Sequence, residues 1–238
     1  MANIIRSDTC FSAWVDVFEH LSLQENKDDT NLLVQINDPT DFSGIDTWLT
    51  DYDPEKYAPG KGKVRHVVNT IFPFRLKSYF PNREDFYRKY VSIFNSSTAY
   101  KNWGTYFQRL ISFGRECQPQ GINQLERAIQ ALQGGSPQKY FITFHITAAN
   151  IESNVRPLGG PCWQYGELII NELGALDLVA VYRNHDYYCK ALGNFIGLAK
   201  LLNFICTESG KRPGRLIIHA IHAYSSQPMS KLTRLINR

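Results

Sequence analysis

Cys162 is the residue of this chain best placed for covalent chemistry. It follows Pro161 and the pair Gly159-Gly160, and it precedes a predicted strand. A cysteine at a junction between a loop and a strand can expose its sulfur, and a thiolate is a strong nucleophile. The alternative is a buried, inert thiol that packs as a small hydrophobic side chain. We take Cys162 as the candidate nucleophile and keep the inert thiol as the competing interpretation.

A run of polar side chains ends the second strand of a predicted hairpin. Its sequence is Tyr182-Arg183-Asn184-His185-Asp186. An arginine at such a place can hold a phosphate through two parallel hydrogen bonds, and its charge lowers the pKa of a nearby thiol. The alternative interpretation is a solvated hairpin end.

Asn194 stands at the start of a predicted apolar helix. An asparagine there can simply cap the helix. Its amide also offers one donor group and one acceptor, so it can read the edge of a nucleic base. Both interpretations stay open from the residue alone.

The last predicted strand carries His219, His222 and Tyr224. Side chains two residues apart share a face of a strand, so His222 and Tyr224 point together and His219 points the other way. Two neighbouring hydrogen-bonding groups can grip a ribose hydroxyl. The alternative is a core histidine with a tyrosine at the sheet edge. A metal site built from His219 and His222 is disfavoured, because their rings lie on opposite faces.

Composition and charge exclude several classes of protein. The chain has 238 residues, 43% of them hydrophobic, which is enough for one sizeable core and argues against disorder. No apolar run reaches the roughly 18 residues that a membrane helix needs, and the first ten residues lack the layout of a signal peptide. The formal net charge is +4, without a dense basic block, which argues against nucleic acid as a partner. We expect a cytoplasmic protein with no membrane contact.

The cysteines favour neither a disulfide framework nor a zinc site. Their number is odd and no two form a Cys-x-x-Cys pair. They are Cys10, Cys117, Cys162, Cys189 and Cys206. We expect no metal, and we expect most of these thiols to be buried.

Hydrophobic periodicity predicts the elements that must position these residues. Helices are expected over 11–23, from a cap at Asn82 to about Phe94, from a cap at Ser97 to Phe113, over 122–132 before Gly134, and over 192–206. Strands are expected over 32–36, 64–74, 139–148 and 215–224, with a hairpin of 164–171 and 175–184. Residues 24–62 are otherwise the least regular stretch. This order predicts an α+β fold.

The order of the motifs resembles that of the thymidylate synthase and pyrimidine nucleotide hydroxymethylase superfamily. The resemblance covers about 102–224, roughly half of the chain. The matching segments are Trp103-Gly104-Thr105-Tyr106, Asn123-Gln124-Leu125, Pro161-Cys162-Trp163, Tyr182-Arg183-Asn184-His185-Asp186, Asn194 and His222-Ala223-Tyr224. The resemblance implies a single domain over 1–238, with 1–60 a divergent N-terminal region. It also implies a three-layer arrangement of a mixed sheet with flanking helices, paired sheet to sheet in a homodimer.

The resemblance implies a covalent mechanism. Cys162 would add to C6 of a pyrimidine nucleotide such as dUMP or dCMP, and C5 would then attack 5,10-methylenetetrahydrofolate. Asp186 would act beside the base and the folate. Synthases reduce the product to a methyl group, whereas hydroxymethylases hydrate it. An asparagine at the position of Asn194 goes with uracil in this family. The implied substrate contacts are Tyr106, Lys139, Arg183, Asn184, Asn194, His222 and Tyr224.

Several positions depart from the family pattern. Trp163 stands where the family has histidine, and Asn184 where it has serine. The general-base glutamate would fall near Lys89, and only Lys139 can stand in for an arginine pair that the partner subunit supplies. Lys61, Lys63 and Arg65 are candidates for the first phosphate loop. Because 14 residues follow Tyr224, we expect a weaker hold on folate and a wetter site than the family has.

Three hypotheses follow. The first is a transferase that methylates or hydroxymethylates C5 of a pyrimidine nucleotide, with the wetter site favouring hydroxymethylation. The second is a nucleotide-binding protein without turnover on the same fold. The third is an interaction protein that has kept the fold and lost the pocket.

Overall fold

The fold is built from one mixed sheet and a set of helices. The computed structural model describes residues 2–43, 64–97, 104–114, 121–134, 142–147 and 160–226. The strands are β1 (Ile4–Ser7), β2 (Asp28–Ile36), β3 (Ile142–His145), β4 (Trp163–Ile170), β5 (Ala175–Tyr182), β6 (His185–Asp186) and β7 (Arg212–Tyr224). The helices are α1 (Cys10–Leu23), α4 (Val64–Ile71), α5 (Phe74–Tyr79), α6 (Arg83–Ser96), α7 (Tyr106–Ile111), α8 (Gln124–Gln133) and α9 (Ala191–Ser209).

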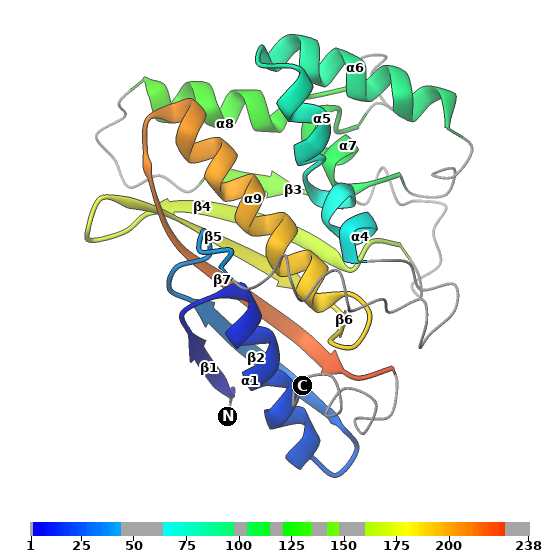
Figure 1. Ribbon diagram of the computed structural model, residues 1–238, viewed down its shortest axis with the longest axis vertical. Coiled ribbons are helices and arrows are strands. Elements are labelled where there is room, and N and C mark those ends of the chain that lie inside the picture. Colours follow the sequence, from blue (N-terminus) through cyan, green and yellow to red (C-terminus); the bar gives the residue numbers. More distant parts are fainter. Residues whose placement is uncertain are drawn as a thin grey trace.

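The strand order is β1-β2-β7-β5-β4-β3, and β6 pairs with β7. Strand β7 lies at the centre, antiparallel to β2 and parallel to β5 (Figure 1). Strand β5 ends at Tyr182, beside Ala220 of β7. The chain then continues along β7 in the same register, so that His185 lies beside Ala223 and Asp186 beside Tyr224. This continuation sets the polar run against the end of β7 that carries His222.

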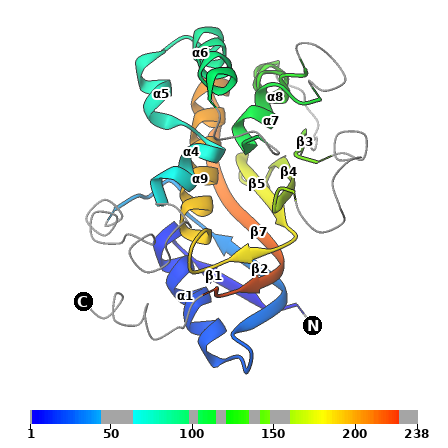
Figure 2. The ribbon, with the colours of Figure 1, turned by 90° about the vertical axis from the view of Figure 1, so that its right-hand side faces the viewer.

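The helices stack against one face of the sheet. Figure 2 shows three layers, in which α9 lies on the sheet and α4 and α5 lie outside α9. Helix α1 packs beside α9 on the same face, over β1 and β2. Within the described ranges, no helix packs on the opposite face. The predicted α+β class, with a mixed sheet and flanking helices, is therefore confirmed.

Helix α9 is the centre of the core, and a glycine lets α4 approach it closely. Almost the whole of α9 is buried, in keeping with its apolar sequence. A Cβ atom on Gly193 would lie 2.6 Å from the Cβ of Val67 in α4, closer than packed carbon atoms can come. The absence of a side chain at Gly193 is therefore what sets the distance between the two helices.

Most predicted elements are confirmed. Helix α1, the hairpin of β4 and β5, and helix α9 agree with the predicted ranges to within a few residues. Asn82 caps α6 as predicted, because its side-chain oxygen accepts a hydrogen bond from the backbone N–H of Asp85 at 3.2 Å. The prediction of one domain over 1–238, with 1–60 as a divergent region, stays a prediction.

Two local predictions are wrong. Residues 64–71 form helix α4 and not a strand. Their buried side chains are Val64, Val67, Val68 and Ile71. This spacing is helical, although the β-branched residues favour a strand. Ser97 is the C-terminal cap of α6, and Thr105 caps α7, the described part of the helix predicted to reach Phe113. Strand β1, which pairs with β2 in parallel, was not predicted.

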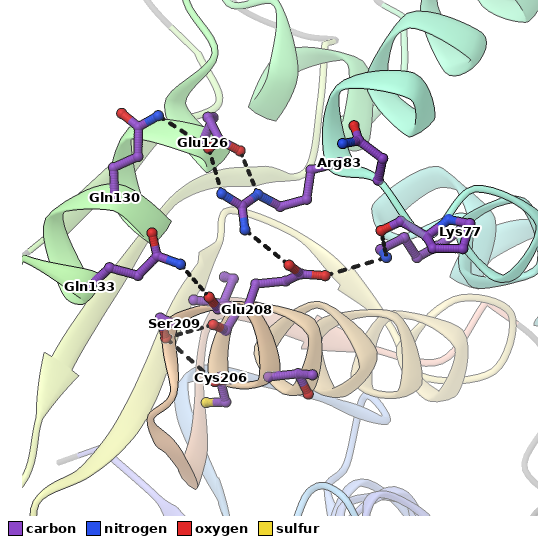
Figure 3. A network of polar contacts seen from close by, with 12 residues as sticks. Lys77, Arg83, Glu126, Gln130, Gln133, Cys206, Glu208 and Ser209 are labelled. Atoms are coloured by element: carbon purple, nitrogen blue, oxygen red, sulfur yellow. Dashed lines mark hydrogen bonds and ion pairs between the residues drawn. The ribbon is translucent and has the colours of Figure 1, made fainter.

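A network of charged side chains ties the outer helices to α9 (Figure 3). The Arg83 guanidinium of α6 donates two hydrogen bonds to the Glu126 carboxylate of α8, at 2.8 and 2.9 Å. A third bond, at 2.9 Å, reaches Glu208 of α9, which also lies 3.3 Å from the ammonium group of Lys77. Two cations and two carboxylates thus join four helices.

We expect Arg83→Met to lower the free energy of unfolding by about 1 kcal/mol, because these groups are partly exposed. The Arg83 guanidinium holds the pKa of Glu126 below its ordinary value. A carboxyl whose pKa is lowered on folding stabilises the fold at neutral pH, and this stabilisation is lost as the pH falls below the ordinary pKa of glutamate and through the lowered one. Urea unfolding at pH 7 and at pH 3 measures both effects.

The matched control is Arg88→Met, on the same helix. The Arg88 side chain is 73% exposed, and its one ion pair to a described residue is with Asp85, one turn away. We expect no measurable change from it. An Arg83→Met protein as stable as the Arg88→Met protein at pH 7 would contradict the role given to the network.

Candidate functional site

Cys162 and Arg183 are held side by side at adjacent strand ends. The backbone N–H of Arg183 donates to the carbonyl oxygen of Cys162 at 2.9 Å. The Arg183 guanidinium donates to the carbonyl oxygen of Gly160 at 3.1 Å, and it lies near enough to the Cys162 thiol to lower its pKa. The sulfur and the guanidinium therefore occupy one site.

Burial raises the pKa of the half-buried Cys162 thiol above its ordinary value. The positive charges of Arg183 and Lys190 lower the pKa, and the Asp186 carboxylate raises it. Arg183 thus acts in the expected direction, but burial outweighs it. Cys162 is therefore protonated in the free protein, and the Arg183 guanidinium can stabilise the thiolate once it forms. Sequence reasoning missed Lys190, which the turn before α9 brings near the sulfur.

Tyr106 positions the segment that carries Cys162. Its buried hydroxyl oxygen accepts hydrogen bonds from the backbone N–H groups of Cys162 and Trp163, both at 3.2 Å. Its ring packs edge-on against the ring of Trp163, with 5.4 Å between centroids. Burial raises the pKa of Tyr106, so the hydroxyl stays protonated. Tyr106 therefore contacts the backbone of the candidate nucleophile and fixes the position of this backbone.

We expect Tyr106→Phe to lower the free energy of unfolding by about 1–3 kcal/mol, because two backbone N–H groups lose their acceptor. The rate at which iodoacetamide alkylates Cys162 should change as well, since the loop that presents the sulfur is released. Urea unfolding and mass spectrometry of the Cys162 peptide measure the two effects. Tyr165→Phe is the control, because the Tyr165 side chain lies on β4 and is 37% exposed. Equal stability of the two variants would contradict the positioning role.

Asp186 fixes the turn between β6 and α9. Its Oδ1 atom accepts hydrogen bonds from the backbone N–H groups of Tyr188, Cys189 and Ser226, at 3.1 to 3.3 Å. Its Oδ2 atom accepts none from the described residues. The carboxylate is 7% exposed and lies close enough to Tyr224 to raise its pKa. One carboxylate oxygen thus holds the turn, and the other makes no hydrogen bond to the described residues.

Asn194 does not cap helix α9, so the interpretation of this residue as a helix cap is wrong. Helix α9 begins at Ala191, and Lys190 occupies the N-cap position. Asn194 lies one turn inside the helix. The side-chain amide, in a residue only 5% exposed, is hydrogen-bonded to His185, with 3.1 Å between Nδ2 of Asn194 and Nε2 of His185. His185 packs flat on Tyr182, which stacks in turn on Trp163. Asn194 is therefore joined to the Cys162 segment through a column of rings.

His222 and Tyr224 lie together at the end of β7, with their rings stacked at 5.2 Å. Nδ1 of His222 donates to the side-chain oxygen of Asn184 at 2.7 Å. Burial, together with the nearby Asp186 and Cys162, raises the pKa of Tyr224 to about 12. His219 instead approaches the side chain of Asn31, with 3.3 Å between the two polar atoms.

Asp28 is a site residue that sequence reasoning missed. Its carboxylate lies 3.4 Å from Nε2 of His222 and is partly exposed. The antiparallel pairing of β2 with β7 places Asp28 opposite Tyr224. No motif contains this residue, so only the sheet register could have revealed it.

Among the described residues, no remaining candidate joins this cluster. Lys139, Lys61 and Lys63 lie outside the described residues. Lys89 and Arg65 are exposed on α6 and α4. In the part of the chain that the structure describes, no three histidine, cysteine or carboxylate side chains gather as a metal site. Among the same residues, no helix has both the length and the apolar character of a membrane span.

Three curated proteins are similar to the chain, and each carries the name "Putative thymidylate synthase". The protein of Methanothermobacter marburgensis is 29% identical over 106 residues, which are 44% of this chain and 45% of that protein. The protein of Methanosarcina acetivorans is 28% identical over 120 residues, or 50% of this chain and 51% of that protein. The protein of Methanothermobacter thermautotrophicus is 29% identical over 106 residues, 44% of this chain and 45% of that protein. The chain thus matches about half the length of these relatives.

No protein-family model matches the sequence. Among solved structures, thymidylate synthase from phage T4 is similar with a TM-score of 0.45 and 16% identity, over 56% of this chain and 43% of that chain. At this TM-score the structural match adds nothing to the sequence matches. The sequence matches confirm the resemblance that the motifs predicted.

Proposed function

We propose, on the premise that the chain is a member of the thymidylate synthase-like superfamily, that it is a transferase acting on C5 of a pyrimidine nucleotide. The substrate class is dUMP or dCMP, and the product carries a methyl or hydroxymethyl group at C5. The observation that supports this most is the Cys162 thiol near enough to the Arg183 guanidinium for its charge to lower the thiol pKa, in a segment positioned by Tyr106. Nothing in a purely structural hairpin end requires this pairing.

Cys162 is the proposed nucleophile. The thiol loses its proton, and the Arg183 guanidinium stabilises the thiolate that remains. The sulfur electron pair forms a bond to C6 of the pyrimidine, and the electron pair of the C5–C6 double bond moves toward C5 and O4. After C5 has gained its new substituent, it loses its proton and the sulfur leaves C6. A nucleotide labelled with tritium at C5 therefore releases that tritium during turnover.

The other polar residues are proposed to hold the nucleotide. Arg183 also faces its phosphate, together with Asn184. His222 and Tyr224 face the ribose, and Asn194 faces the edge of the base. The stacked rings of His222 and Tyr224 and the bond from His222 to Asn184 support a rigid surface at the sugar end. The cations near the sulfur can bind the phosphate of a nucleotide. The hydrogen-bonding groups at the end of β7 can bind the hydroxyl groups of its sugar. The nucleotide would then lie along the strand ends.

5,10-Methylenetetrahydrofolate is the proposed one-carbon donor, and it supplies the carbon that C5 acquires. The residues present fit such a partner at one point, because Oδ2 of Asp186 accepts no bond from the described residues and can receive an N–H group. Asp186 would orient the donor while its Oδ1 atom keeps the turn fixed. Water that adds to the one-carbon group on C5 would give hydroxymethylation, whereas hydride from the folate at the same carbon would give methylation.

A homodimer is proposed through the sheet face that carries no described helix. Large apolar side chains stand on the strands there, including Tyr165 at 37% and Ile221 at 43% exposure. Apolar surface of this kind is typical of an interface. Lys139 of the partner subunit would then reach the phosphate. The cytoplasm is the proposed location, since Cys10, Cys162, Cys189 and Cys206 are all free thiols, as they remain in a reducing compartment.

Calorimetry with dUMP and dCMP, followed by tritium release from the C5-labelled nucleotides, tests this proposal. We expect binding of one of them and release of tritium that depends on methylenetetrahydrofolate. Binding without release would favour the second candidate, a nucleotide-binding protein. The exposed Lys89 near the position of the family glutamate supports that alternative. Absence of binding at millimolar nucleotide would contradict both functions.

A further inference from the structure

Asp28 places a carboxylate on the side of His222 that faces away from Asn184. Its Oδ2 atom lies 3.4 Å from Nε2 of His222, whereas Nδ1 of the same ring lies 2.7 Å from the side-chain oxygen of Asn184. The two nitrogens of an imidazole point to different sides of the ring. The His222 ring therefore lies between an amide on one side and a carboxylate on the other.

The pairing of β2 with β7 fixes this arrangement. Asp28 lies directly opposite Tyr224, and Thr30 lies opposite His222. Side chains opposite one another in an antiparallel pair stand on the same face, and the diagonal neighbour two residues away is also within reach. Asp28 therefore shares a face with His222 and Tyr224, whose rings are stacked at 5.2 Å. The register of the two strands thus makes the carboxylate a fixed part of the site.

Most of the hydrogen-bonding capacity of the Asp28 carboxylate is unused among the described residues. The 3.4 Å contact of Oδ2 with His222 is long for a hydrogen bond, and Oδ1 makes none to the described residues. The side chain is 44% exposed, so a ligand can reach it. The ammonium group of the adjacent Lys27 donates instead to the carbonyl oxygen of Ser22, at 2.6 Å. A carboxylate only accepts hydrogen bonds, so this one can bind a hydroxyl group and repels an anion.

The candidate site thus carries opposite charges on its two sides. Arg183 and Lys190 bring positive charge near the Cys162 sulfur. Asp28 brings negative charge to the far side of His222. A 5′-phosphate is favoured beside the guanidinium, whereas an uncharged sugar hydroxyl suits the carboxylate. A second phosphate, attached to the sugar, would face a like charge there.

We propose that Asp28 is a specificity-determining residue that accepts a hydrogen bond from a sugar hydroxyl and excludes nucleotides that carry a second phosphate on the sugar. The inference rests on the proposed function, because it concerns the nucleotide site of that function. It restricts the substrate class to 5′-monophosphates whose 3′-hydroxyl is unmodified. A nucleotide inside a polynucleotide is excluded by the same repulsion, because its 3′-oxygen carries a phosphodiester.

Asp28→Asn is the direct test, because asparagine keeps the shape and one acceptor oxygen and removes the charge. The ligands are the monophosphate that the protein binds, dUMP or dCMP, and the corresponding 3′,5′-bisphosphate. We expect calorimetry on the unmodified protein to show at least about tenfold weaker binding of the bisphosphate. In the Asp28→Asn protein the ratio of the two dissociation constants should fall by about tenfold, the effect of one unit charge close to a phosphate. Improved binding of the bisphosphate is a gain that a loss of folding cannot produce.

Glu25→Gln is the matched control. Glu25 lies in the turn between α1 and β2, three residues before Asp28, and it is exposed. The variant removes the same charge from the same end of β2, outside the contacts described for the site. We expect the ratio of the two dissociation constants to stay that of the unmodified protein.

Salt dependence in the unmodified protein gives a readout that does not depend on a variant folding. Dissolved ions screen repulsion between charges, so the ratio should fall as salt is raised from about 0.05 M to about 0.5 M. Equal binding of the two ligands, a ratio insensitive to salt, or the same ratio in the Asp28→Asn protein would overturn this inference alone, since the monophosphate still binds. If the unmodified protein binds neither dUMP nor dCMP, the proposed function fails and the inference fails with it.

Discussion

Replacing Cys162 by serine is expected to reduce tritium release from a C5-labelled pyrimidine nucleotide by at least about a thousandfold. The serine hydroxyl fits the same space, but its pKa is far too high for it to attack C6 as an anion. Removal of a nucleophile leaves only the acceleration that binding and orientation provide. The control is Cys206→Ser, since Cys206 is buried in α9 and lies in none of the contacts described for the site. Release that persists in the Cys162→Ser protein would contradict the proposed mechanism.

The pH dependence of the same reaction carries further information. Burial raises the pKa of Cys162, so the thiolate is the minor form at pH 7. Below the pKa the thiolate fraction grows tenfold per pH unit, and the rate should rise by about tenfold between pH 6 and pH 7 when the thiolate limits it. Arg183→Gln removes the main charge that lowers this pKa, so the rate at pH 7 should fall. A rate that is independent of pH in the unmodified protein would contradict thiolate attack as the limiting step.

Replacing Arg215 by methionine is expected to give the largest loss of stability, about 3–5 kcal/mol. Its partner Asp177 on β5 is 1% exposed. Nε and Nη2 of Arg215 lie 2.9 and 2.7 Å from Oδ2 of Asp177, and the backbone N–H of Arg215 donates to Oδ1 at 2.7 Å. Asn171 donates to the same Oδ1 at 2.8 Å. Removal of the guanidinium leaves a buried carboxylate with half of its partners and no compensating charge.

The residue before Arg215 on β7 supports this interpretation of the ion pair. A Cβ atom on Gly214 would lie 2.2 Å from Oδ1 of Asp177, so a glycine is required for β7 to pass the carboxylate. Arg212→Met is the matched control, because Arg212 lies on the same strand and is exposed. Urea unfolding of both variants measures the difference. A change in Arg215→Met no larger than in Arg212→Met would show that the pair contributes no stability.

The sequence predicted best those elements whose pattern and composition agree. The hairpin of β4 and β5 and helix α9 combine the right period with suitable residues and clear turn signals. Helix α4 was missed because five β-branched residues in a short segment favour a strand, whereas the burial of four of them follows the helical period. Strand β1 was missed because a four-residue strand at a sheet edge has little pattern of its own.

Only those residues of the candidate site that lie in sequence motifs could be predicted. Cys162, Arg183, Asp186 and Tyr224 stand in recognisable segments, and the structure brings them together at the end of β7. Asp28 and the bond between His185 and Asn194 depend on contacts between distant segments. Pairing register and ring packing, which create such contacts, are properties of the folded chain. The competition between burial and charge at Cys162 likewise requires a known environment.

The most direct measurement is intact-mass spectrometry of the protein after incubation with 5-fluoro-dUMP and methylenetetrahydrofolate. Fluorine at C5 cannot leave as a proton does, so the covalent bond between sulfur and C6 should persist. The account predicts a stable adduct of protein, nucleotide and donor, located by peptide mapping on Cys162 and absent from the Cys162→Ser protein. A protein that binds the nucleotide and gains no mass, or gains it on another residue, would contradict the assignment of Cys162 as the nucleophile.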